Sequence, residues 1–200
     1  MKKNKLLLAS AIMISILTPM SQVKADWKRD NVGWWYSLNN GSYYKNTGAY
    51  IDGKWYRFDD RGYMMTGWQP LAERNATSLK KINWSYFDPV NGDQKIGWQN
   101  IDGNWYYLGE DNDGRARQNE WAYDSKTSKW YYFNDNCAMV QSKWIKYKNE
   151  WYYLNRDGSM ATGWLQDGSK LYLLYSNGVM AHDTVLYGYK FDYDGVAAKV

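Results

Sequence analysis

Tryptophan and tyrosine are the residues of this chain best suited to recognising a ligand. The 200-residue sequence contains 13 Trp and 20 Tyr but only 4 Phe. Their electron-rich faces stack on sugar rings and attract cations, and they suit cations that lack hydrogen-bond donors particularly well. Trp is the strongest of these partners. Recognition by aromatic faces is therefore the chemistry that this composition favours.

The aromatic residues recur at a regular spacing of about twenty residues, which is typical of stacked repeats. Runs similar to Trp-Tyr-Tyr-Leu begin at anchors Trp35, Trp55, Trp84, Trp105, Trp130 and Trp151, and Leu171 and Gly188 hold the same position in two weaker copies. A second aromatic stands before most anchors, at Trp68, Trp98, Trp121, Trp144 and Trp164. Glycine follows several anchors by seven residues, as Gly158 follows Trp151.

Each repeat reads as a β-hairpin. In 98–108, two short aromatic strands flank Asp102-Gly103, a pair typical of a tight hairpin turn. A two-stranded hairpin is marginally stable alone, so neighbouring hairpins must bury each other's aromatic faces. We therefore predict an all-β fold, a solenoid of stacked β-hairpins. It spans 26–200 in about eight units, with a loop insertion at 69–81.

The first 25 residues have the pattern of a secretory signal peptide, with a basic start, an apolar run and a Val23-Lys24-Ala25 end. They also carry the excess positive charge, because removing them leaves equal numbers of basic and acidic residues. This balance argues against nucleic acid as a partner. With no second apolar run, the sequence predicts a secreted protein without direct membrane insertion.

Residues for catalysis or metal binding are few. The single cysteine, Cys137, cannot form an intramolecular disulfide, and it occupies the position of a repeat glycine. His182 is the only histidine. The sequence lacks a Gly-x-Ser-x-Gly elbow, a His-Glu-x-x-His motif, a phosphate loop and a dinucleotide fingerprint. We expect no catalytic residues, no metal and no cofactor.

Two stretches resemble the choline-binding, or cell-wall-binding, repeats of streptococcal cell-surface proteins. They are Gly97-Trp98 with Asp102–Leu108, and the run Lys148–Trp164. The resemblance extends over Trp27–Val200. It implies that choline is held by two aromatic residues of one hairpin and one of the next. A quaternary ammonium suits such a cage, because it is always charged and its nitrogen donates no hydrogen bond.

Carried over unit by unit, this arrangement joins the leading Trp, the anchor Trp and the second Tyr of the following unit. The predicted choline-binding sets are Trp98, Trp105 and Tyr132; Trp121, Trp130 and Tyr153; Trp68, Trp84 and Tyr107; and Tyr50, Trp55 and Tyr86. At both ends the pattern predicts incomplete sets, because the required positions hold Arg57 and Leu173.

The resemblance implies a non-catalytic protein that attaches non-covalently to the bacterial cell wall. Its partner would be the phosphocholine of teichoic and lipoteichoic acids. Two alternatives stay open. The repeats could bind glucan or a host glycan as an adhesin, or they could be the regulatory or targeting part of a cell-wall hydrolase. A host-surface or wall-protein partner is compatible with each alternative.

Overall fold

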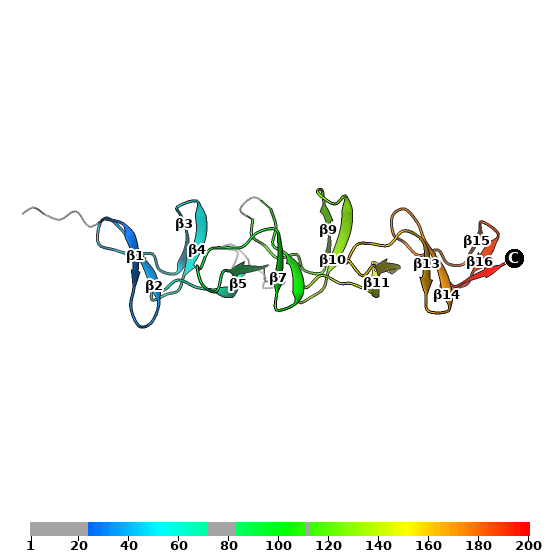
Figure 1. Ribbon diagram of the computed structural model, residues 1–200, viewed down its shortest axis with the longest axis horizontal. Coiled ribbons are helices and arrows are strands. Elements are labelled where there is room, and N and C mark those ends of the chain that lie inside the picture. Colours follow the sequence, from blue (N-terminus) through cyan, green and yellow to red (C-terminus); the bar gives the residue numbers. More distant parts are fainter. Residues whose placement is uncertain (1–23, 72–82, 111–112) are drawn as a thin grey trace, which may run out of the picture.

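The computed structural model describes residues 24–71, 83–110 and 113–200. Strands are the regular elements of this part of the chain, and they pair as antiparallel hairpins. The hairpins follow one another along a single long axis, from β1 at one end to β15 and β16 at the other (Figure 1). The predicted all-β class and the stacking of hairpins are confirmed. The hairpins stay separate sheets and form no closed solenoid.

Seven hairpins have two strands, and the last sheet has three. Their bounds are β1 (Asp26–Arg29) with β2 (Trp34–Ser37), β3 (Thr47–Ile51) with β4 (Lys54–Phe58), β5 (Gly67–Leu71) with β6 (Asn83–Phe87), β7 (Trp98–Ile101) with β8 (Asn104–Tyr107), β9 (Glu120–Asp124) with β10 (Lys129–Phe133), β11 (Lys143–Tyr147) with β12 (Glu150–Leu154), β13 (Gly163–Asp167) with β14 (Lys170–Leu174), and β15 (Thr184–Leu186) with β16 (Tyr189–Phe191) and β17 (Ala197–Lys199).

Two predicted segments, the insertion and the signal peptide, lie mostly outside the described residues. The insertion expected at 69–81 starts later, since Gln69, Pro70 and Leu71 pair with β6; residues 72–82 lie outside the described part. The predicted signal peptide lies almost wholly outside it as well. No helix within 24–71, 83–110 and 113–200 is long and apolar enough to cross a membrane.

Main-chain hydrogen bonds join each hairpin to the next. The residue in the Met position of one unit donates its N–H to the anchor carbonyl of the preceding unit. The pairs are Met64 to Trp34, Gln94 to Trp55, Ala116 to Trp84, Met139 to Trp105, Met160 to Trp130 and Met180 to Trp151, all at 2.7–2.9 Å. Because these six junctions repeat the same bond, the register between neighbouring hairpins is fixed from β1–β2 to β13–β14.

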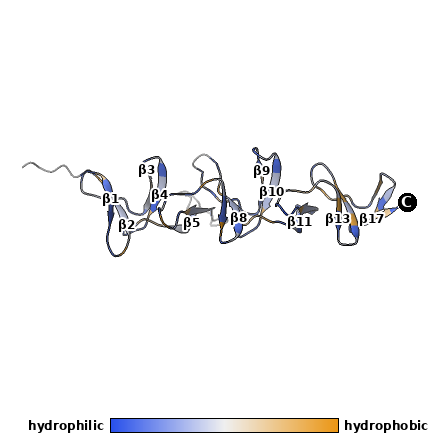
Figure 2. Cartoon of the chain, in the orientation of Figure 1, coloured by the Kyte–Doolittle hydropathy of each residue, from blue (hydrophilic) through white to orange (hydrophobic). Residues whose placement is uncertain are grey.

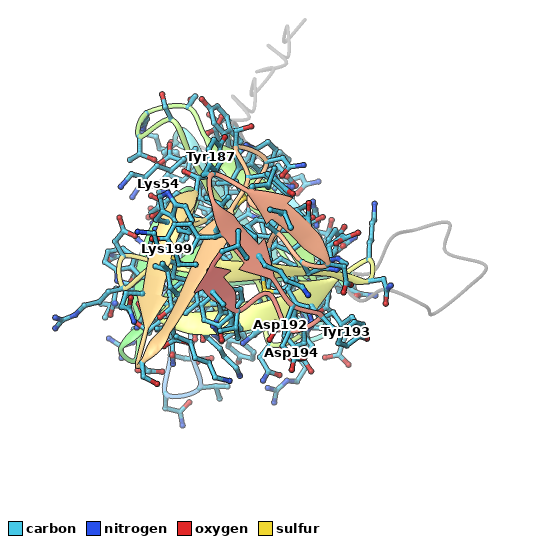
Figure 3. All side chains as sticks on the ribbon, turned by 90° about the vertical axis from the view of Figure 1, so that its right-hand side faces the viewer. Lys54, Tyr187, Asp192, Tyr193, Asp194 and Lys199 are labelled. Atoms are coloured by element: carbon cyan, nitrogen blue, oxygen red, sulfur yellow. The ribbon has the colours of Figure 1, made fainter. Side chains whose placement is uncertain are left out.

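The core is a narrow column and not a central mass. One residue per unit forms most of it, and these side chains are almost fully buried: Phe58, Leu108, Phe133, Leu154, Leu174 and Phe191. Apolar residues accordingly appear in short patches along the axis (Figure 2). Polar and charged side chains radiate around it (Figure 3). Stability therefore depends on contacts between neighbouring units.

Candidate aromatic binding sites

Alternation along the strands divides each hairpin into two faces. The forward face carries the leading Trp, the anchor Trp and the second Tyr, as Trp98, Trp105 and Tyr107 do in β7–β8. The rear face carries the first Tyr, which is Tyr106 in that hairpin. The forward face of one hairpin meets the rear face of the next, so Trp68 packs on Tyr106 with ring centroids 4.8 Å apart.

The same contact recurs along the chain and defines an aromatic trio: the leading and anchor Trp of one hairpin with the first Tyr of the next. The described residues contain five complete trios. They are Trp27, Trp34 and Tyr56; Trp68, Trp84 and Tyr106; Trp98, Trp105 and Tyr131; Trp121, Trp130 and Tyr152; and Trp144, Trp151 and Tyr172. In all five, the leading Trp meets the first Tyr edge to face, with centroids 4.8–5.1 Å apart.

The structure brings the predicted tryptophan pairs together, but it assigns the third ring differently. Trp98 and Trp105 lie 6.4 Å apart, and Trp68 and Trp84 line one cavity. The tyrosines predicted to complete these sets point the other way. Tyr132 and Tyr153 pack on the leading Trp of their own hairpins, Trp121 and Trp144.

Tyr107 and Tyr86 likewise pack on the leading Trp of their own hairpins, Trp98 and Trp68 respectively. Each predicted second Tyr is therefore replaced in its set by the first Tyr of the same strand. The alternation of side chains places the two Tyr on opposite faces, so that the second Tyr shares the face of its own anchor. Which of the two faces meets the preceding hairpin is fixed by the register between the units.

The fourth predicted set, Tyr50, Trp55 and Tyr86, is not assembled. Tyr50 and Trp55 do pair across their hairpin, with centroids 5.4 Å apart. The leading position of this hairpin, however, is Gly48. The facing first-Tyr position is Ser85, which is fully buried and donates to the Gly114 carbonyl oxygen at 2.6 Å. This junction is polar where the five trios are aromatic.

The ends of the chain also differ from expectation. In β1–β2 the anchor position is held by Trp34 and not by Trp35, because a four-residue turn shifts the register so that Arg29 pairs with Trp34. Position 57 is then not needed, since Tyr56 completes the trio. Likewise Tyr172 completes the set of Trp144 and Trp151 without Leu173. The last junction has Trp164 and Tyr189 but Leu171 as its anchor.

In four of the five trios the anchor ring is the accessible part, and in the fifth the anchor Trp84 is half-buried. Trp34, Trp105, Trp130 and Trp151 are each 38–44% exposed, whereas the leading Trp of the same hairpins are half-buried. A cavity of about 260 Å³ opens at one trio, between Trp68, Trp84 and Tyr106. Residues 135–137 close its other side. This cavity is large enough for a small cation, and the exposed anchor rings give the other four trios a partly open aromatic surface.

Charges near the trios are not uniform. Burial raises the pKa of the Tyr106 and Tyr152 hydroxyls, which keeps both rings neutral near pH 7. Cations of the chain itself lie over two anchor rings, Arg29 over Trp34 at 5.4 Å and Lys146 over Trp151 at 5.9 Å. These are the two trios nearest the ends of the chain. At each of them a ligand cation would meet an anchor ring that a positive side chain already contacts.

Cys137 lies against one trio. Its backbone φ is 63°, in the region that favours glycine, which confirms that it replaces a turn glycine. Its side chain is buried beside Leu108 and Ala116, with Trp68 and Trp84 packed on the same cluster. His182 is hydrogen-bonded to Asp183 at 2.9 Å and lies after β14. Among the described residues, no group of three His, Cys, Asp or Glu could hold a metal ion.

Comparison with known proteins decides what the repeats are. Residues 126–162 and 140–184 match the family model described as "Choline-binding repeat", and 49–64 and 96–116 match "Putative cell wall binding repeat". The matched segments of this chain are choline-binding and cell-wall-binding repeats. The predicted resemblance is confirmed, and the matched segments contain every member of two trios, those led by Trp98 and Trp144.

Solved structures of choline-binding proteins share the fold. Choline binding protein F of Streptococcus pneumoniae is 32% identical, with a TM-score of 0.73 over 88% of this chain and 58% of that one. The choline-binding domain of CbpL from the same species is 28% identical, with a TM-score of 0.61 over 86% and 85%. A lysin of Pneumococcus phage Dp-1 is 35% identical over 78 residues, covering 32% of this chain and 26% of the lysin. The choline-binding repeats thus correspond to only part of the first and third relatives.

Proposed function

We propose that residues 26–200 form a secreted, non-catalytic module that attaches non-covalently to phosphocholine on the teichoic and lipoteichoic acids of a bacterial cell wall. The observation that carries this proposal is the recurrence of one aromatic trio at five junctions among the described residues. The matches to choline-binding and cell-wall-binding repeats support the same ligand.

The chemistry of the trios supports a quaternary ammonium. Each cation–π contact contributes roughly 0.5–2 kcal/mol. After the entropy lost on association, one trio should bind at about millimolar affinity, near −4 kcal/mol. Such weak binding is useful when it is repeated. A chain with several trios, facing a polymer that repeats its ligand, gains roughly 10²–10⁴ in avidity.

Retention on a tertiary-amine resin tests the ligand. We expect the full chain to bind and free choline to elute it. Trp105→Ala should elute at a lower choline concentration, because it removes the exposed ring of a complete trio. Tyr187→Asn is the control, since Tyr187 is 79% exposed and belongs to no trio. An unfolded variant would lose its aromatic circular dichroism, which separates lost binding from lost structure.

Two other functions would give different results. A glucan- or host-glycan-binding adhesin would be eluted by soluble dextran or a host glycan and not by choline. The targeting part of a cell-wall hydrolase is supported by the partial match to a phage lysin. Digestion of purified walls by residues 26–200 would contradict the non-catalytic proposal.

A further inference from the structure

Two of the five trios carry a carboxylate on the leading indole. Asp124 Oδ2 accepts a hydrogen bond from Trp98 Nε1 at 3.3 Å, and Asp167 Oδ2 accepts one from Trp144 Nε1 at 2.8 Å. Both acids end the first strand of the following hairpin, β9 and β13. They lie on its rear face, the face that supplies the first Tyr of the trio.

The other three trios have an uncharged side chain at this strand-end position. Ile51 ends β3 in the cluster on which Trp27 packs. Ile101 ends β7, in the hairpin that faces Trp68. Tyr147 ends β11 and meets Trp121 edge to face at 6.4 Å. The aromatic members are of the same kinds in all five trios, so the strand-end acid distinguishes these two. One of them also has a cation of the chain, Lys146, over its anchor Trp151.

A carboxylate at this position acts on a bound cation in two ways. Its negative charge lies within several ångströms of the ring faces, well inside the Debye length at physiological salt. The hydrogen bond also draws electron density toward the indole ring, which strengthens the attraction between its face and a cation. The effect operates through Trp98 and Trp144, without direct contact between carboxylate and ligand.

Hydrogen bonds to Asp124 favour its charged form. Although burial alone raises its pKa, hydrogen bonds from the Lys126 and Thr127 backbone, the Thr127 hydroxyl and the Trp98 indole lower it overall. Lys129, which stands opposite Asp124 in the hairpin, is bound to Asp157 at 2.8 Å. Lys170 stands opposite Asp167 and is exposed to solvent.

We propose that Asp124 and Asp167 are positioning residues that divide the cation sites of this chain into two classes, charge-assisted trios at Trp98 and Trp144 and purely aromatic trios elsewhere. The inference rests on the proposed function, that the trios bind choline. Asp124 makes the trio of Trp98 bind choline more tightly than the purely aromatic trios, and Asp167 offsets the positive charge that Lys146 brings to the anchor Trp151. The affinity of both trios depends on ionic strength. The aromatic trios discriminate less between choline and an uncharged molecule of the same shape.

The test compares choline with 3,3-dimethylbutan-1-ol, its neutral isostere, by calorimetric titration of the full chain at low and high salt. Asp124→Asn and Asp167→Asn keep an oxygen that can accept the indole N–H but remove the charge. We expect each to weaken choline binding at its trio by about three- to tenfold at low salt. Binding of the alcohol should not change. The double variant should lose most of the salt dependence.

Asp60→Asn, at an exposed turn position, makes the same change in net charge and should leave binding as in the wild type. Equal weakening of choline and the alcohol would overturn the inference, because it would assign the acids a purely structural role. Wild-type choline affinity and salt dependence in the double variant would overturn it too. A wild-type chain that binds no choline would instead overturn the proposed function and this inference together.

Discussion

At the scale of single residues, the contact between units depends on a matched pair of side chains. The turn glycine of one unit covers the Met of the preceding unit, and a Cβ at Gly158 would lie 2.4 Å from Met139 Sδ. Gly114 covers Gln94 in the same way. At one junction both members of the pair are replaced, with Ala116 in the Met position and Cys137 in the glycine position. The small side chain leaves the space that the thiol fills.

This compensation predicts a coupled pair of substitutions. Ala116→Met should lower the free energy of unfolding by about 1–3 kcal/mol, because the longer side chain meets Cys137. Adding Cys137→Gly should restore most of the loss, since it recreates the pair found at other junctions. Urea unfolding followed by tryptophan fluorescence measures both effects. Costs that simply add in the double variant would contradict the coupling.

At the scale of elements, an Asx residue organises the turn after several hairpins. Asp88 Oδ1 accepts from the Val90 and Asn91 backbone at 2.9 and 2.8 Å. Asn134 holds the same position after β10 and accepts from Asn136 and Ala138. Asp88 differs because its other oxygen also pairs with Lys95 at 2.8 Å. The hydrogen bond from Lys95 and those from the turn lower the pKa of Asp88 to about 2.

The lowered pKa predicts a pH dependence. The charged form of Asp88 favours the folded state, so its contribution is complete above the unfolded value of about 3.9 and is lost as the pH falls through about 2. Asp88→Asn keeps the turn but loses the ion pair. It should lower the free energy of unfolding by about 1–2 kcal/mol at pH 7.

The difference in the free energy of unfolding between Asp88→Asn and the wild type should shrink between pH 4 and pH 2, because the wild type loses the same charge there. Acid titration of unfolding by circular dichroism measures this convergence. A constant difference across that range would show that Asp88 acts through packing alone.

At the scale of the whole molecule, the hairpins present their trios in several directions. Hairpins β1–β2, β7–β8 and β13–β14 point one way across the axis, and β3–β4 and β9–β10 point the opposite way (Figure 1). At the C-terminal end, Tyr193 lies beside Asp192 and Asp194, whereas Tyr187 lies on the opposite side of the axis (Figure 3). A ligand-bearing polymer must therefore wrap around the axis or bridge several chains to occupy every trio.

Avidity should consequently fall steeply as trios are removed. Trp105→Ala alone should reduce binding to a choline-bearing polymer only a few-fold. Trp105→Ala with Trp151→Ala should reduce it more than tenfold, because two intramolecular binding steps are lost. Surface binding to immobilised teichoic acid compares the variants, and monomeric choline is the control. A double variant no weaker than the single one would contradict multivalent attachment.

The sequence by itself determined the class of fold and the kind of recognition. Aromatic repeats of about twenty residues with Asp-Gly turns allow little besides stacked hairpins, because an isolated hairpin cannot bury its own aromatic face. The pairing of Trp98 with Trp105 also followed, since both positions lie on one face of one hairpin. These features depend on the spacing of residues close together in the chain, which can be read from the sequence.

The tertiary structure decided which tyrosine completes each site. Tyr131 and Tyr132 are adjacent in sequence and alike in chemistry, but only Tyr131 faces Trp98 across the junction. The choice depends on which faces of successive hairpins meet, and the anchor-carbonyl hydrogen bonds fix that register. The same register brings Asp124 to the indole of Trp98, a contact across 26 positions of sequence that repeat spacing alone does not specify.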